Sequence, residues 1–256
     1  MRAASLSQPL LLLLLLHPHG SSSYCTLRQD CSPGAPGCLP RATSAAERAP
    51  FPLNGSGAPA ACPQYAASGC CTPAANSQLF LSLLLAQQTL GEPVSGGCPA
   101  CYANVAALWC AFACAPTQSD FLQVLGPVNV TNNDTGRREL VLDTDVALAP
   151  AYAGALFTSC AGVGFVRGNA LLDSLPAFFA YMGGGQAETT AAARVNFRVA
   201  DAPGALALAA LNCCSYPENA TDPGGSGMAT CPCASCLGMC PGGNCSSARA
   251  HEGFDL

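Results

Sequence analysis

The sequence contains no lysine, and its only histidines are His17, His19 and His251. Charged residues make up 10% of the chain, against about a quarter in typical soluble proteins. Catalytic triads, Cys-His pairs, histidine metal sites, P-loops and Schiff bases all need residues that the body of this chain lacks. We therefore expect no enzyme, no cofactor and no metal site.

The charges that are present have an acidic balance. The formal net charge is -5 and the isoelectric point is near 5.0. Nucleic acids and anionic membrane surfaces attract basic proteins. The charge balance thus argues against both kinds of partner.

Cysteine is abundant, with 18 residues, an even number that is typical of a disulfide framework in an oxidising compartment. Arg2 and the seven leucines of Leu10–Leu16 precede small residues at 20–23. This order is that of a signal peptide, too short to span a bilayer. We predict a signal peptide at 1–23, one cysteine-rich domain at 24–245, and a tail or the start of a linker at 246–256. Five glycosylation sequons fit the secretory pathway: Asn54, Asn129, Asn133, Asn219 and Asn244.

The stretch from Cys98 to Val124 organises the chain. It predicts a helix that ends at Ala115-Pro116, because proline cannot supply the next helical N–H group. Cys110 and Cys114 are four residues apart and share one face. A contiguous apolar surface is predicted on this helix, formed by Val105, Leu108, Trp109 and Phe112.

A second helix is predicted from Ala74 to Leu90, with Thr72 as its N-cap and Pro73 in its first turn. Gln78, Ser82 and Thr89 fall on one narrow stripe of this helix. The stripe has two interpretations: it faces solvent, or it points neutral hydrogen-bonding groups into an apolar pocket for a ligand with one hydroxyl.

The remaining segments predict an α+β fold in one domain: several helices and a small mixed sheet. The expected elements are a cysteine knot at 25–38, a polar loop at 127–135, a short strand at 139–143, a helix at 152–160, a helix at 171–182 broken at Pro176, and a strand at 194–199 with Val195, Phe197 and Val199 inward.

Two cysteine patterns allow alternative chemistry. Cys98-Pro-Ala-Cys101 has the spacing of a thioredoxin-like redox pair, but with so many other cysteines each sulfur is expected to bond a distant partner. The tail from Cys231 to Cys240 has thiolate spacing compatible with zinc. Disulfides are the favoured interpretation of both patterns in a secreted chain.

Taken together, five features resemble one known domain: Cys70-Cys71, the helix after it, Cys98-Pro-Ala-Cys101, the run from Trp109 to Ser119, and the Cys231–Cys240 tail. The resemblance is to the N-terminal luminal sterol-binding domain of the Niemann–Pick type C intracellular cholesterol transporter family. It implies an α+β fold around a deep apolar pocket that binds a sterol with its hydroxyl inward. It also implies these disulfides: Cys25–Cys70, Cys31–Cys38, Cys62–Cys110, Cys71–Cys114, Cys98–Cys231, Cys101–Cys160 and Cys233–Cys240, with Cys236 joined to Cys213 or Cys214.

The resemblance also implies site residues. An asparagine that contacts the sterol hydroxyl in the family is replaced here by Gly37, and the family's glutamine position falls on Ala75. We therefore assign the hydroxyl contact to Gln78, helped by Ser82 and Asp30. The other expected sterol-binding residues are Asn76, Asn104, Trp109, Phe112 and Leu27. Leu171 and Leu172 correspond to an apolar surface patch for sterol transfer, whereas the family's Pro-Phe near the pocket mouth is replaced by Glu188-Thr189.

The implied function is that of a sterol-binding domain in the lumen of the lysosome or late endosome. Its expected partners are cholesterol or an oxysterol, a soluble luminal sterol carrier, and the membrane part of a larger transporter. Two alternatives remain: the same architecture binding a folate- or flavin-like ligand, or an extracellular module that binds a protein partner.

Overall fold

The computed structural model describes residues 23–30, 39–53, 61–92, 96–131, 136–164, 166–167, 169, 172–183 and 193–211. They form an α+β domain, as the sequence predicts. Several predicted features lie outside these residues: the signal peptide to residue 22, Leu171, the 185–189 segment, the sequons at Asn54, Asn133, Asn219 and Asn244, and the cysteines at 31, 38, 213, 214, 231, 233, 236, 240 and 245.

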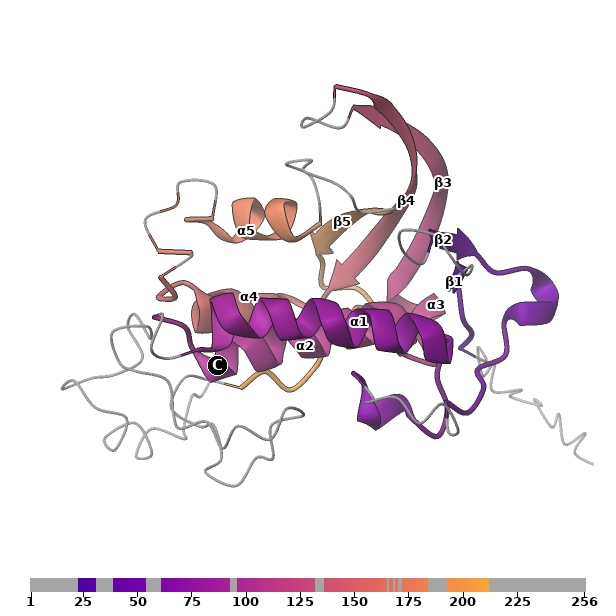
Figure 1. Ribbon diagram of the computed structural model, residues 1–256, viewed down its shortest axis with the longest axis horizontal. Coiled ribbons are helices and arrows are strands. Elements are labelled where there is room, and N and C mark those ends of the chain that lie inside the picture. Colours follow the sequence, from indigo (N-terminus) through magenta and orange to yellow (C-terminus); the bar gives the residue numbers. More distant parts are fainter. Residues whose placement is uncertain are drawn as a thin grey trace, which may run out of the picture.

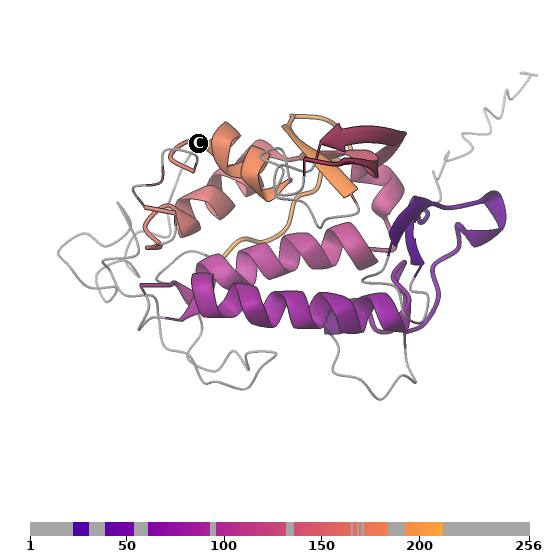
Figure 2. The same cartoon turned by 45° about the horizontal axis from the view of Figure 1, so that its top comes forward.

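Four helices pack in succession. α1 (Pro73–Ala86) continues through the π-helical turn η3 (Gln87–Gly91) and lies beside α2 (Pro99–Cys114). α2 packs against α4 (Pro150–Cys160), and α4 contacts α5 (Leu175–Met182). Figure 2 shows α1 and α2 side by side, with α4 and α5 on the other side of α2.

The ends of the two long helices follow the predicted signals. The Thr72 side chain accepts a hydrogen bond of 3.1 Å from the Ala75 N–H, and Pro73 opens α1 without losing a helical hydrogen bond. α2 ends at Cys114, just before Ala115-Pro116. Both predicted helices are confirmed.

The larger sheet has three strands. β3 (Leu122–Thr131) pairs antiparallel with β4 (Arg138–Leu148), and β5 (Ala193–Val199) pairs parallel with β4. The hairpin of β3 and β4 curves away from the helices (Figure 1). The predicted loop at 127–135 is wrong for residues 127–131, which are strand. Pro127 is compatible with this because β3 is an edge strand of the described sheet.

β3 changes register between Val124 and Gly126, where Gly126 has φ of 123°. Glycine adopts this conformation without steric cost, so the bulge bends the ribbon there. The short helix α3 (Gln118–Phe121) leads into β3.

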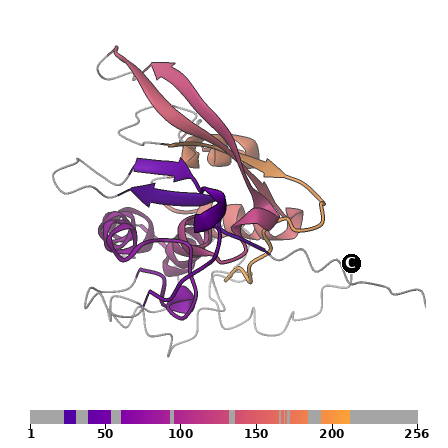
Figure 3. The ribbon, with the colours of Figure 1, turned by 90° about the vertical axis from the view of Figure 1, so that its right-hand side faces the viewer.

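A second, two-stranded sheet stands near the N-terminus. β1 (Leu27–Asp30) pairs antiparallel with β2 (Leu39–Ala42), where the sequence predicted only a cysteine knot. Figure 3 shows this hairpin over the ends of α1 and α2. The short helical turns η1 (Ala45–Glu47) and η2 (Pro63–Tyr65) follow.

Two predicted details of the C-terminal half differ from the structure. Pro176 does not break a helix but lies in the first turn of α5, where its missing N–H has no helical acceptor. Val199, expected to face inward, is 41% exposed because it ends β5, whereas Val195 is 5% exposed.

The core consists of two hydrophobic clusters on either side of α2. One involves α2, α4, α5 and the three-stranded sheet, and the other lies between α1, α2 and the segment around η2. Tyr65, Leu90 and Trp109 pack against both clusters. α2 is therefore the shared wall of the core.

Candidate functional site

Three disulfides fix α2 to its surroundings. Cys62–Cys110 and Cys71–Cys114 join its second half to the chain around α1, and Cys101–Cys160 joins its start to α4. Together with Cys25–Cys70, these are four of the implied pairings. Cys98 is also disulfide-bonded, but Cys101 bonds Cys160, so the Cys98-Pro-Ala-Cys101 pair is not a redox dithiol.

A chain of aromatic rings extends from α2 across the molecule. Trp109 contacts Phe112 and Phe197 edge-on, with ring centroids 5.5 and 6.1 Å apart. Phe197 on β5 contacts Phe179 on α5, which contacts Phe178. Phe112, Phe178 and Phe179 are buried, whereas Trp109 and Phe197 are half-buried. We call Trp109, Phe112, Phe179 and Phe197 the aromatic wall; the described residues leave Trp109 and Phe197 partly exposed and bury the other two.

No charged residue lies on α1 or α2. Between Arg48 and Asp120 the sequence has a single charged residue, Glu92. An apolar ligand packs well against such a surface, because an unpaired charge next to it would be costly.

Asn76 provides an unusual polar group on α1. The side chain is 3% exposed, and its Oδ1 atom has no hydrogen-bond partner within the described residues. It lies one turn before Leu79 and Phe80, which pack with Trp109 against the second core cluster. A buried amide oxygen without a donor is costly, which makes this atom a candidate acceptor for the hydroxyl of a ligand.

Tyr152 on α4 is a second such group. It is 3% exposed, and its hydroxyl has no partner in the described part of the chain. Burial raises the pKa of the Tyr152 phenol, which therefore stays a hydrogen-bond donor at physiological pH. Sequence reasoning missed this residue because an isolated tyrosine in a helix gives no signal of its own.

The polar stripe of α1 faces outward. Gln78, Ser82 and Thr89 are exposed, and the Ser82 hydroxyl donates to the Gln78 backbone carbonyl at 3.3 Å. The buried residues of the helix, Asn76 and Leu83 among them, occupy the other side. The expectation that the stripe points into an enclosed pocket therefore differs from the structure, and its solvent-facing interpretation is the one found.

Asn104 is buried with protein partners. Its Nδ2 donates to Ser159 Oγ and to the Leu211 carbonyl at 2.9 and 2.8 Å, and its Oδ1 accepts from the Leu211 N–H at 2.8 Å. These bonds tie α2 to α4 and to the segment after β5. They account for the burial of Asn104 without a ligand.

Two of the other predicted site residues are core residues, and a third lies in the N-terminal sheet. Leu27 and Leu172 are each 1% exposed in the first core cluster. Leu172 is therefore not part of an exposed transfer patch, because its side chain fills the core. The backbone of Asp30 pairs with Leu39 at the end of β1.

An open cleft of about 650 Å³ lies between the N-terminal segment and the start of β3. Its lining includes Arg48, Asp120, Asp145 and Arg198, and none of the predicted ligand residues. An ion pair of 2.7 Å joins Arg198 to Asp145. With these charges it is not the apolar pocket that the resemblance implies.

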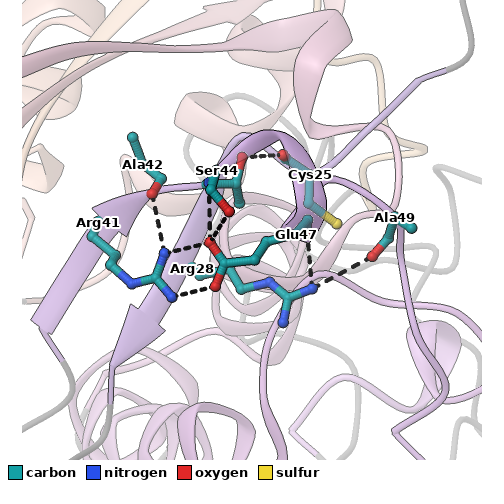
Figure 4. Close-up of polar contacts among 8 residues, drawn as sticks. Cys25, Arg28, Arg41, Ala42, Ser44, Glu47 and Ala49 are labelled. Atoms are coloured by element: carbon teal, nitrogen blue, oxygen red, sulfur yellow. Dashed lines mark hydrogen bonds and ion pairs between the residues drawn. The ribbon is translucent and has the colours of Figure 1, made fainter.

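A polar network holds the N-terminal sheet in place (Figure 4). The Arg41 guanidinium contacts both carboxylate oxygens of Glu47, and Glu47 Oε2 also accepts from the Ser44 N–H and hydroxyl. Hydrogen bonds from Arg41 hold the pKa of Glu47 well below its usual range. Arg28 donates to the Glu47 backbone carbonyl at 2.9 Å.

Gln118 links this N-terminal region to α2. Its Nε2 donates to the carbonyls of Phe112 and Ala113, and its Oε1 accepts from the N–H groups of Thr26 and Leu27. The side chain is fully buried with both ends paired. It fixes the carboxyl end of α2, where the aromatic wall begins.

Neither a metal site nor a membrane span is found in the described parts. No group of three potential metal ligands comes together there. The cysteines of the zinc hypothesis, Cys231 to Cys240, lie outside them. No helix of the described residues is long and apolar enough to cross a membrane.

Comparison with known proteins identifies the family. The family described as Niemann-Pick C1 N terminus matches residues 22–254. The chain belongs to this family. A curated relative, the NPC intracellular cholesterol transporter 1 homolog 1 of Caenorhabditis elegans, is 31% identical over 102 residues. That match covers 38% of this chain and 7% of the relative, so the chain corresponds to a small part of the relative's length.

Proposed function

We propose that this chain is a sterol-binding domain that holds a sterol against the aromatic wall and passes it on during intracellular sterol transport. The membership of the family and the name of the relative, a cholesterol transporter homologue, support transport of this ligand class. The uncharged α1 and α2 supply the kind of surface that a hydrocarbon skeleton needs.

The observation that carries the proposal is the buried, unpartnered Oδ1 of Asn76 beside an apolar surface. A sterol has one hydroxyl, which donates a hydrogen bond to this oxygen. Among the polar residues predicted to bind the sterol, Gln78 and Ser82 are exposed and Asn104 is already paired. Asn76 is therefore our assignment for the hydroxyl contact.

Affinity and orientation come from different groups. Burying about 500 Å² of sterol at about 25 cal/mol per Å² gives roughly 12 kcal/mol before the costs of association. A hydroxyl left without its acceptor costs about 1–3 kcal/mol. The apolar walls thus provide the affinity, and Asn76 selects the orientation with the hydroxyl inward.

Membership of the family also supports a proposal for where the domain acts. We propose that the domain works in the lumen of the lysosome or late endosome, as part of a larger membrane transporter. A soluble luminal carrier is the proposed sterol donor. The aromatic wall contains no titratable side chain, so its contacts with a sterol do not change with pH in that acidic compartment.

The test is equilibrium binding of radiolabelled cholesterol to the secreted chain, in competition with three unlabelled compounds. Cholesterol should compete well, 5-cholestene without the hydroxyl should compete about 5- to 150-fold less well, and cholest-4-en-3-one, which cannot donate, should resemble 5-cholestene. Asn76→Ala should abolish this preference, and Gln78→Ala on the same helix should keep it.

Two outcomes would contradict the proposal. Absence of saturable sterol binding by a correctly disulfide-bonded sample would remove the function. Equal competition by cholesterol and 5-cholestene in the wild type would leave a sterol site but remove the role of Asn76. Titration with folate and riboflavin in the same samples tests the other ligand class.

A further inference from the structure

The outward face of the β3–β4 ribbon carries an asparagine opposite an exposed leucine. Asn129 on β3 and Leu140 on β4 are direct partners in the antiparallel register. Asn129 is exposed, and Leu140 is 67% exposed, as high as any large hydrophobic residue in the described regions. Asn129-Val130-Thr131 is a glycosylation sequon.

The pairing places both side chains on one face of the ribbon. Residues directly opposite each other on antiparallel strands have Cβ atoms about 4.5–5.5 Å apart. The neighbouring pair, Val128 and Val141, faces the other way, and Val141 is 4% exposed. A group attached to Asn129 therefore lies on the face that carries Leu140 and away from the buried face.

Without a covering group, this exposed surface would promote association with other protein chains. β3 is an edge strand of the described sheet, and the ribbon extends beyond the helices (Figure 1). Leu125 on the same strand is 47% exposed. An exposed edge strand with large apolar side chains promotes pairing with another chain.

We propose that Asn129 carries an N-linked glycan, and that this glycan covers Leu140 and the edge of β3. The sugar donor is a lipid-pyrophosphate-linked oligosaccharide of the secretory lumen. The Asn129 Nδ2 forms a bond to C1 of the first sugar, the bond from C1 to the pyrophosphate breaks, the amide loses a proton, and the lipid pyrophosphate leaves. The inference is independent of the sterol site.

The first test is occupancy of the site. The full chain is secreted from mammalian cells as the wild type and as Asn129→Gln, Thr131→Ala and Thr131→Ser. Release of N-glycans by an amidase in ¹⁸O-water, followed by mass spectrometry, marks a glycosylated asparagine as labelled aspartate. We expect label at Asn129 in the wild type and in Thr131→Ser, which keeps the sequon, and in neither other variant. An unlabelled Asn129 in the wild type would overturn the proposal.

The second test addresses the covering role by sedimentation velocity. Asn129→Gln and Thr131→Ala should both shift the protein toward larger species, because Leu140 is then bare. Adding Leu140→Thr to either variant should restore the monomer, and Leu140→Thr alone should change nothing in the glycosylated protein. Variants without the glycan that remain as monomeric as the wild type would overturn the covering role.

Discussion

The helical layer and the sheets of this domain are stabilised by different chemistry. α2 carries three disulfides and lies in a stretch with one charged residue between Arg48 and Asp120. The described ion pairs all belong to the sheets and their flanks: Arg41–Glu47, Arg194–Asp143 and Arg198–Asp145. An apolar ligand wall cannot contain unpaired charges, so disulfides fix it without adding any.

Removing a disulfide from the helical layer should have the largest effect on stability. We expect Cys62→Ser combined with Cys110→Ser to lower the free energy of unfolding by about 2–5 kcal/mol, because the unfolded chain regains the freedom of the loop. Urea unfolding followed by circular dichroism measures this loss. If the free energy of unfolding fell less in this double variant than in Asp143→Asn, the contrast between the disulfide-bonded helices and the ion-paired sheets would be contradicted.

Truncating the aromatic wall should weaken sterol binding. Trp109 is half-buried, and its contacts with Phe112 and Phe197 are edge-on. Trp109→Ala should weaken cholesterol binding at least about tenfold, since removing its apolar contacts costs about 1.5–3 kcal/mol. The matched control is Tyr181→Ala, an aromatic residue on α5 that is 39% exposed, which should bind cholesterol as the wild type does.

Breaking an ion pair in the sheet should affect stability and leave sterol binding intact. Asp143 accepts two hydrogen bonds of 2.8 Å from Arg194 and one of 2.9 Å from Asn196. Asp143→Asn should cost about 1–2 kcal/mol, because the half-exposed Arg194 partly regains water. Loss of sterol affinity in this variant, with the fold retained, would show that the two regions are coupled.

The same ion pair predicts the pH dependence of stability. Hydrogen bonds from Arg194 lower the pKa of Asp143 below its ordinary value. Its contribution is therefore complete above the unfolded carboxyl pKa of about 3.9 and is lost as the pH falls through the lower folded pKa. No histidine occurs in the described residues, so the free energy of unfolding should stay constant from pH 7 to pH 5. A steep fall within that range would contradict this.

The smallest effects are expected on the exposed face of α1. Gln78→Ala and Ser82→Ala should each change stability by at most about 0.5 kcal/mol, because both side chains face water. Cholesterol affinity should stay within about twofold, whereas the hypothesis drawn from the sequence predicts a clear loss for Gln78. Cholesterol-binding titrations of the two variants and the wild type decide between these two expectations.

The helices of this domain could be predicted from the sequence because their signals are local. Thr72-Pro73 starts α1 and Ala115-Pro116 stops α2 wherever the rest of the chain lies. The strand through Pro127 to Thr131 could not be predicted in this way. Its polar residues are typical of a loop, but they lie on the outward face of a ribbon whose pairing depends on β4.

The candidate site was predictable in its residue types more than in its geometry. The apolar surface of α2 around Leu108 and Phe112 followed from helical spacing. The side of α1 that faces inward could not be predicted from helical spacing, because leucines occur all around that helix. Two of them, Leu81 and Leu85, are 61% and 67% exposed. Without an apolar stripe to set the orientation, the sequence could not distinguish Asn76 from Gln78.

Photolabelling shows most directly where the ligand lies in this domain. A cholesterol analogue with a diazirine in its ring system is bound to the secreted chain, irradiated, and mapped by mass spectrometry of the digested protein. Labelling is expected at the partly exposed residues of the aromatic wall, Trp109 and Phe197, and excess cholesterol should suppress it. Competable labelling confined to the charged cleft, at residues such as Thr26, Arg48 or Gln123, would contradict it.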